Sequence, residues 1–250
     1  HRVNPAAAAG TAIASLIKGP IGNDQRMSEG LSILTSTLGG QMSDNLVPSR
    51  DAYLDLLTAL AVSSPHGEIG LSFARTGSRW ASSRELMVCG RAVNGSDKSH
   101  EISPADLHTE EARKRRVQRW KESKTEHHDL DWVTAHWAKP IGKYCTRRSA
   151  FWRVTRRVAN QICAAPFDDG AWSSYLAWTN LYHVAPLKTG NPGKPLKDRQ
   201  RDACVRLLEC DVMRLGPRRL LVLAGHDWAS PFFTNGVTWS SGAAFVQGSG

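Results

Sequence analysis

Polar residues follow three short apolar runs, and their types suit a ligand that offers hydrogen-bonding groups. The three polar segments, which we expect to be loops, are GRAVNGSD (90–97), NLYHVAPLKTGNP (180–192) and GHDWASPF (225–232). The carboxamide of Asn180 has one acceptor and two donors, enough to read the edge of a nucleobase. The same residue type also caps turns, so its spacing alone leaves both roles open.

The apolar runs before these segments have the length of strands. They are ELMVCG (85–90), YLAWTN (175–180) and RRLLVLAG (218–225). Between the second and third, apolar residues recur at helical spacing over 196–217, and Gly216-Pro217 ends the pattern. The order strand, helix, strand indicates parallel pairing, and ligands bind beyond the carboxyl ends of parallel strands. We therefore expect the polar segments to form one site.

Three further helices are predicted, around Ser28–Leu38, over 51–62 and over 149–164. In the last of these, Phe151 and Val158 are among the residues expected to face the core. These patterns predict an α/β fold with a parallel sheet, an N-terminal helical or irregular extension over 1–75 and an α/β domain over 76–250.

The charge balance favours a polyanionic partner. The formal net charge is +9, from 32 Lys and Arg against 23 Asp and Glu, which suits nucleic acid or an anionic membrane surface. No apolar run reaches the roughly 18 to 20 residues that span a bilayer. Five scattered cysteines indicate a reducing, cytoplasmic setting. The Ala-rich opening lacks an initiating Met, a charged leader and a cleavage signature, so we expect a trimmed start or tag remnant, not an export signal.

The segment EARKRRVQRWKESK (111–124) concentrates seven basic residues around one tryptophan. It is either a solvated helix face or mobile loop, or an element that follows phosphates while the tryptophan stacks on a base. A second basic loop surrounds GNPGKP (190–195). The candidate DNA-binding residues are Arg113, Lys114, Arg115, Arg116, Arg119, Trp120, Lys188, Asn191 and Lys194.

The order of several motifs resembles the uracil-DNA glycosylase superfamily. The resemblance rests on WTNLYHVAP followed by GNP, on LGPRRLLVLAG, on SAFWRV (149–154) and on LMVCGRAVNG (86–95), and covers roughly residues 80 to 235. It implies a three-layer α/β/α sandwich with a mainly parallel central sheet. It also implies an enzyme that flips a modified or deaminated base out of DNA and hydrolyses its N-glycosidic bond.

The resemblance also suggests site residues. Asn180 would bind the flipped base, Gly90 would allow close approach to the sugar, and backbone amides near Arg91 and Ala92 would contact the base.

The chain departs from the family pattern in two places. Ala92 stands where members of the superfamily carry an acidic or amide side chain, which leaves Asn94 and Asp97 as the nearest catalytic replacements. No histidine follows the third strand in GVTWSSGAAFVQGSG (236–250), so either that motif lies outside this chain or His226 takes its role; His226 could equally be a hydrogen-bonded strand-end residue. Small residues at 92 and 94 would suit a bulkier base, such as a modified pyrimidine of phage DNA excised in antiviral defence.

Metal and cofactor chemistry is not expected. Adjacent histidines seldom bind one ion, which argues against the cluster at His127, His128, Asp129 and Asp131. Cys204 lacks the partners an iron–sulfur cluster needs, because Val184 stands at one ligand position. The expected partner is DNA bound by a monomer. The alternatives are a catalytically inactive nucleic-acid-binding protein with the same fold, and an unrelated nucleotide-processing α/β enzyme.

Overall fold

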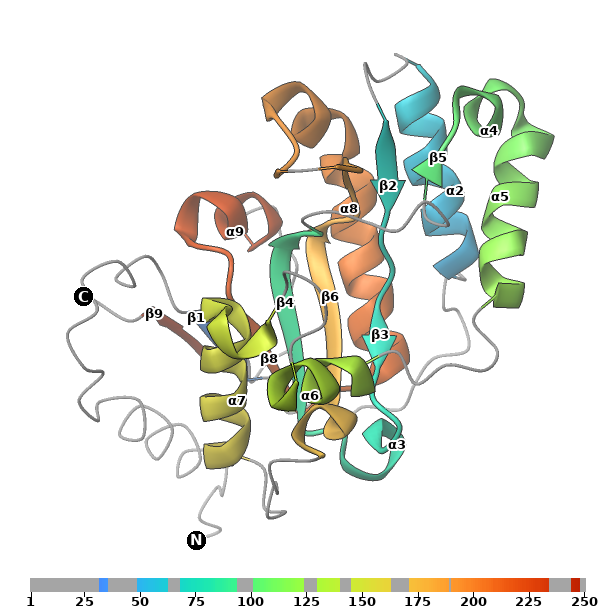
Figure 1. Ribbon diagram of the computed structural model, residues 1–250. Coiled ribbons are helices and arrows are strands. Elements are labelled where there is room, and N and C mark those ends of the chain that lie inside the picture. Colours follow the sequence, from blue (N-terminus) through green and yellow to red (C-terminus); the bar gives the residue numbers. More distant parts are fainter. Residues whose placement is uncertain are drawn as a thin grey trace, which may run out of the picture.

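The computed structural model describes residues 32–35, 49–62, 68–93, 101–123, 130–139, 145–162, 171–188, 190–233 and 244–247. Within these residues the main sheet has six strands, shown in Figure 1. In spatial order they are β3 (Arg75–Thr76), β6 (Leu176–Tyr182), β4 (Leu86–Ala92), β8 (Arg219–Val222), β1 (Ser32–Thr35) and β9 (Ala244–Gln247).

The sheet is mixed. β4 pairs in parallel with both β6 and β8, whereas β3, β1 and β9 join by antiparallel pairing. The expectation of a mainly parallel sheet therefore holds for the three central strands and not for the flanking ones. Parallel strands need a long crossover connection, and the chain supplies one from β6 to β8, which lie on either side of β4.

That crossover is helix α8 (Lys194–Leu215), which confirms the predicted strand, helix, strand unit. Its buried residues include Cys204, Leu207 and Leu208, which belong to the predicted apolar stripe. The helix ends where the sequence indicated. Gly216 adopts a left-handed conformation with φ 57°, and its N–H donates to the carbonyl of Val212 at 2.9 Å.

Helices pack on both faces of the sheet (Figure 1). Alternating residues of β4 divide between two apolar clusters, with Met87 and Cys89 in one and Leu86 and Val88 in the other. The first cluster includes α8 and α2 (Ser49–Ala61). The second includes α6 (Asp131–Ala138), the short helix η3 (Trp172–Tyr175) and α7 (Ala150–Ile162).

A smaller antiparallel sheet lies beside the main one. Its strands are, in order, β5 (Glu101–Ile102), β2 (Ile69–Leu71) and β7 (Val184–Pro186). Since β7 follows β6 after a single residue, the chain passes directly from the main sheet to the smaller one. Two helices, α4 (Pro104–His108) and α5 (Glu110–Ser123), follow β5, and α5 lies at the right of Figure 1. The remaining short elements are α3 (Trp80–Ser83) and η2 (Thr146–Arg148).

The N-terminal part corrects one prediction and confirms another. The helix expected around residues 28–38 is wrong for the described residues, because Ser32–Thr35 forms β1 between β8 and β9. Pairing on both sides satisfies its backbone groups and outweighs local helical spacing. The helix predicted over 51–62 is present as α2, with Tyr53, Leu56 and Leu57 buried. The division of the chain at residue 75 stays a prediction.

No helix within the described residues combines the length and the apolar character that crossing a membrane requires.

Candidate functional site

The carboxyl ends of the three central strands meet at one edge of the sheet, as their sequence pattern predicted. Gly90 of β4 lies opposite Asn180 of β6 in the parallel register. On the other side of β4, the N–H of Leu223 donates to the carbonyl of Cys89 at 2.8 Å. The guanidinium of Arg91 donates to the carbonyl of Ala224 at 2.6 Å. We call the edge formed by Gly90, Arg91, Asn180 and Ala224 the rim.

Asn180 and Gly90 fit against each other. A Cβ atom at position 90 would lie 2.8 Å from Oδ1 of Asn180 and 3.3 Å from Cε2 of Phe151. Glycine at this position therefore makes room for the Asn180 carboxamide and the Phe151 ring on one face of the sheet. Asn180 is 2 % exposed, and within the described part of the chain its carboxamide makes no hydrogen bond. A desolvated carboxamide without a protein partner there is available to a ligand.

Two sequence expectations about this edge need correction. Strand β6 does not end at Asn180 but continues to Tyr182, because Ala92 and Tyr182 remain paired. The segment 225–232, expected as a loop, forms helix α9 (His226–Phe233). Its first turn is closed by the N–H of Ala229 donating to the carbonyl of Gly225 at 3.1 Å.

Helix α9 places an aromatic and cationic group beside the rim. The ring of Trp228 packs edge-on against Tyr182 at 5.6 Å between centroids. Two cations lie over Trp228, with Nζ of Lys197 at 4.3 Å and Cζ of Arg91 at 5.6 Å from the ring centroid. Burial raises the pKa of the Tyr182 phenol, so this group is neutral at pH 7.

Two buried polar side chains fix the chain just after β6. The Nδ1 of His183 donates to the carbonyl of Ser72 at 2.9 Å, and the carbonyl of His183 accepts from the N–H of Ser72 at 2.7 Å. Gln200 of α8 bonds both backbone groups of Val184, at 2.9 Å to the N–H and 2.8 Å to the carbonyl. The Gln200 carboxamide thus satisfies the backbone groups of Val184 as the backbone of a neighbouring strand would. In the sequence, Gln200 lies one helical turn before Cys204, on the apolar side of the predicted helix. A polar residue at such a position indicates a buried hydrogen-bonding role.

On the opposite face of β6, a buried carboxylate supports the strand. Asp211 is buried and accepts from the hydroxyl of Thr179 at 3.0 Å and from Arg214 at 3.2 Å. Burial, and then the charge of Asp211, raises the pKa of the Cys89 thiol well above its usual value. Burial likewise raises the pKa of Cys204 to about 12. Both thiols are therefore protonated and unsuited to nucleophilic chemistry.

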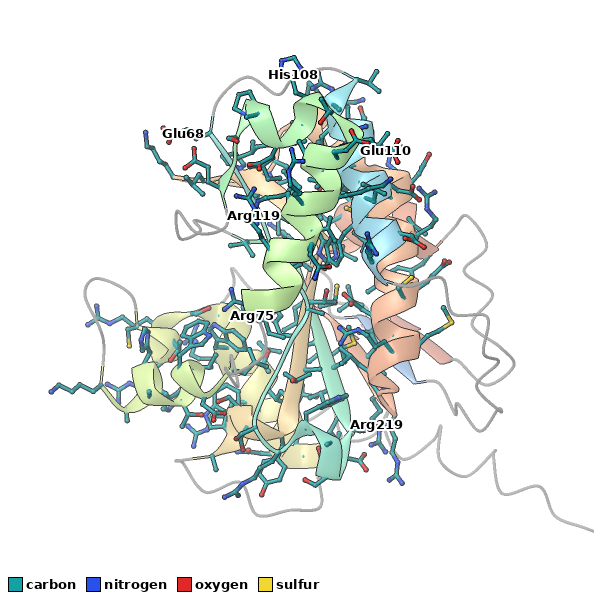
Figure 2. The ribbon with its side chains drawn as sticks, turned by 90° about the vertical axis from the view of Figure 1, so that its right-hand side faces the viewer. Glu68, Arg75, His108, Glu110, Arg119 and Arg219 are labelled. Carbon is teal, nitrogen blue, oxygen red and sulfur yellow. The ribbon has the colours of Figure 1, made fainter. Side chains whose placement is uncertain are left out.

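The basic helix α5 is largely occupied by contacts within the protein. Arg116 is 7 % exposed and donates to the carbonyl of Glu101 at 3.1 Å. Arg113 donates to the carbonyl of Leu107 at 2.6 Å. Arg119 pairs with Asp106 at 2.6 Å and Lys114 with Glu110 at 2.5 Å; Figure 2 labels Arg119 and Glu110 on this helix.

The other candidate DNA-binding residues differ in exposure and in their ion pairs. Arg115 and Asn191 are exposed. Lys188 pairs with Glu68 at 3.0 Å and Lys194 with Asp198 at 2.6 Å. Trp120 lies on α5, and its side chain is outside the described part of the structure.

Asp106 is the anchor of the α5 arginines. Burial alone would raise the pKa of its carboxyl group. Hydrogen bonds from the backbone N–H and hydroxyl of Ser103, together with the charges of Arg119 and Arg116, hold that pKa below its usual value. The helical segments around α4 and α5 are therefore tied together by an ionised carboxylate.

Several predicted site residues lie outside the described structure. Asn94 and Asp97 fall within 94–100, and His226 begins α9 without a described side chain. Of the acidic and histidine cluster at 127–131, Asp131 is described and accepts from the hydroxyl of Ser78 at 3.4 Å. Among the described residues, no group of three or more His, Cys, Asp or Glu is arranged to hold a metal ion.

Comparison of the chain with protein-family models, curated proteins and solved structures found no match. The chemistry of the rim is thus the basis for assigning a function. Sequence reasoning missed the roles of three residues. Phe151, beside Gly90, was predicted to face the core; Trp228, beside Arg91, lay in a polar segment; and Gln200, which supports Val184, lay within the helix predicted over 196–217.

Proposed function

We propose that this protein is a DNA glycosylase that flips out a modified or deaminated pyrimidine and hydrolyses its N-glycosidic bond. The observation that carries the proposal is the arrangement of Asn180, Gly90 and Phe151. A carboxamide without a hydrogen bond to the described residues lies beside an aromatic ring, and a strand residue without a side chain makes space for both. This combination suits a flat heterocycle, whose edge would bond the amide and whose face would meet the ring.

The low exposure of Asn180 favours binding. Since its carboxamide has already lost most of its water, a hydrogen bond to a base edge requires little further desolvation of the protein. The contact then helps to offset the few kcal/mol that base flipping costs.

In the reaction, water adds to C1′ of the sugar as the bond to the base breaks, and the base leaves with the bonding electrons and gains a proton. We propose that Asn94 and Asp97 act on the sugar and the attacking water. We propose that His226 assists the departing base. The backbone amides of Arg91 and Ala92 would contact the base. The small side chain at Ala92 favours a bulky substrate base, such as a modified pyrimidine of phage DNA, and hence a role in antiviral defence.

We also propose that the fold is a three-layer α/β/α sandwich. Helices on both faces of the parallel central strands support this proposal. The enzyme would act as a cytoplasmic monomer on DNA and without a cofactor.

The test is mass spectrometry of bases released from a panel of DNAs that carry uracil and modified pyrimidines. Asn180→Ala is expected to lower base release by about 5- to 150-fold, the value of one hydrogen bond of about 1–3 kcal/mol to a buried group. Gln161→Ala, which removes an exposed carboxamide on α7, is the matched control and should retain activity. Release of no base from any DNA of the panel would overturn the proposal. Release of uracil alone would overturn the modified-base substrate.

A non-catalytic nucleic-acid-binding protein is the second candidate. It is favoured by Ala92, because the described strand end from Gly90 to Val93 carries no acidic side chain. DNA binding without base release, unaltered by Asn180→Ala, would support this candidate over the first.

A further inference from the structure

A short segment around α7 carries positive charge alone. Residues 145–162, which form η2 and α7, include five arginines and no Asp or Glu. We call Arg147, Arg148, Arg153, Arg156 and Arg157 the α7 arginine face. Arg153 and Arg157 are one helical turn apart, so their side chains leave the helix in the same direction about 6 Å apart along its axis.

Most of these arginines are not used by the protein itself. Arg147, Arg148, Arg153 and Arg157 are exposed, and within the described residues none of them makes an ion pair. Arg156 lies over the ring of Trp137, with 4.7 Å from its Cζ to the ring centroid. The described acidic residue of the neighbouring helix α6, Asp131, accepts a hydrogen bond from Ser78.

Helix α5 is the contrasting case. The sequence predicted this basic segment as a candidate DNA-binding element. In the structure, however, four of its cations contact carbonyls or carboxylates of the protein. Figure 1 shows α7 and α5 at opposite sides of the main sheet. A DNA strand that runs from the rim along one of these helices therefore runs away from the other helix.

The α7 arginine face is joined directly to the rim. The first turn of α7 carries Phe151, whose Cε2 lies beside Gly90. The following residue, Trp152, packs edge-on against Trp178 of β6 at 5.6 Å and against Trp132 of α6 at 5.9 Å. This packing fixes the direction of the helix, and Arg157 is about 9 Å along the axis from Phe151 at 1.5 Å per residue.

Resting on the proposed function, we propose that the α7 arginine face binds the phosphate backbone of the DNA whose base enters the rim. Guanidinium groups form paired hydrogen bonds with phosphate, and exposed arginines without ion pairs give up no protein contact when they do so. An anionic membrane fits less well, because amphipathic membrane helices also present large apolar side chains. The large apolar residues that are exposed in the described structure, Val62 (83 %) and Met213 (48 %), lie outside α7.

The experiment measures binding of a fluorescent 30-base-pair DNA by anisotropy at 50 to 200 mM KCl. The test variant is Arg153→Gln with Arg157→Gln. The control is Arg50→Gln with Arg206→Gln, which removes the same charge from α2 and α8, where Arg206 pairs with Asp55 at 3.2 Å. Melting temperatures should change by less than about 2 °C, because the substituted side chains are exposed.

The test variant is expected to reduce the slope of log K against log salt by about 1.8, since each lost phosphate contact removes about 0.9. At about 0.1 M salt this corresponds to roughly 10- to 60-fold weaker binding. The control should keep the wild-type slope. An unchanged slope in the test variant, no DNA binding by the wild type, or binding to phosphatidylserine vesicles in place of DNA would each overturn the inference.

A third variant, Lys114→Gln with Arg115→Gln, compares the two basic helices. A loss of slope there, with none in the α7 variant, would assign the backbone contact to α5 and overturn the inference. Base release under single-turnover conditions with saturating protein separates this inference from the proposed function. A slope that depends on α7 without base release defeats the glycosylase alone, and base release with a slope independent of α7 defeats the α7 contact alone.

Discussion

Gly90→Ala is expected to disturb the rim while leaving the fold largely intact. The added Cβ would lie 2.8 Å from Oδ1 of Asn180, whereas ordinary contacts begin at 3.4 Å. The Asn180 carboxamide must therefore shift by about 0.6 Å or rotate away. Because the obstructing atom is the end of a side chain, the expected loss of unfolding free energy is about 0.5–1.5 kcal/mol, the cost of a strained rotamer.

The chain offers a matched control in Gly77→Ala. There the new Cβ would lie 2.3 Å and 2.4 Å from the carbonyl oxygens of Ser174 and Ser173, which are backbone atoms. Relief requires the backbone to move, so a loss of about 3 kcal/mol or more is expected. The entropy that alanine removes from the unfolded chain is the same in both variants and cancels in the comparison.

Thermal unfolding followed by circular dichroism measures the difference. Gly90→Ala is expected to lower Tm by about 1–6 °C and Gly77→Ala by at least about 6 °C, at roughly 2–4 °C per kcal/mol for a chain of this size. Base release by Gly90→Ala should fall by about 10- to 100-fold at temperatures well below its Tm, because small displacements of a binding group are costly. Equal Tm losses in the two variants would refute the steric reasoning. Full base release by a folded Gly90→Ala would refute the role of the carboxamide.

Three further predictions concern stability and reactivity. The lowered pKa of Asp106 contributes stability that is present above the ordinary value of 3.8 and is lost as the pH falls below it; Asp106→Asn should flatten that loss in urea titrations at several pH values, and an unaltered pH dependence would contradict it. Cys204, with a pKa of about 12, should resist iodoacetamide at pH 8 in the native protein and react in guanidinium, as checked by peptide mass spectrometry; rapid native labelling would exclude its burial. Gly216→Ala places a side chain at φ 57° and should lower Tm by about 2–4 °C, for a cost of about 1 kcal/mol, whereas an unchanged Tm would show that the helix end relaxes freely.

Local sequence pattern was sufficient for the elements around the rim. The stripe that includes Cys204 and Leu208 predicted α8, and Gly216 marked its end, because helical periodicity and a left-handed terminus are properties of neighbouring residues. The same logic predicted strands β4, β6 and β8. It failed for Ser32–Thr35, since a strand of four residues is stabilised by partners from the other end of the chain.

The sequence by itself determined that polar residues follow three apolar strands and that the chain is rich in arginine. Only the tertiary structure decided that Gly90 makes room for Asn180 and Phe151. It also decided that Arg113, Arg116 and Arg119 of α5 contact acceptors of the protein, while Arg153 and Arg157 of α7 are exposed. The physical reason is that contacts and ion pairs depend on distances between residues far apart in the chain. Composition and spacing count charges and amides, but the partners that neutralise or confine them are supplied by folding.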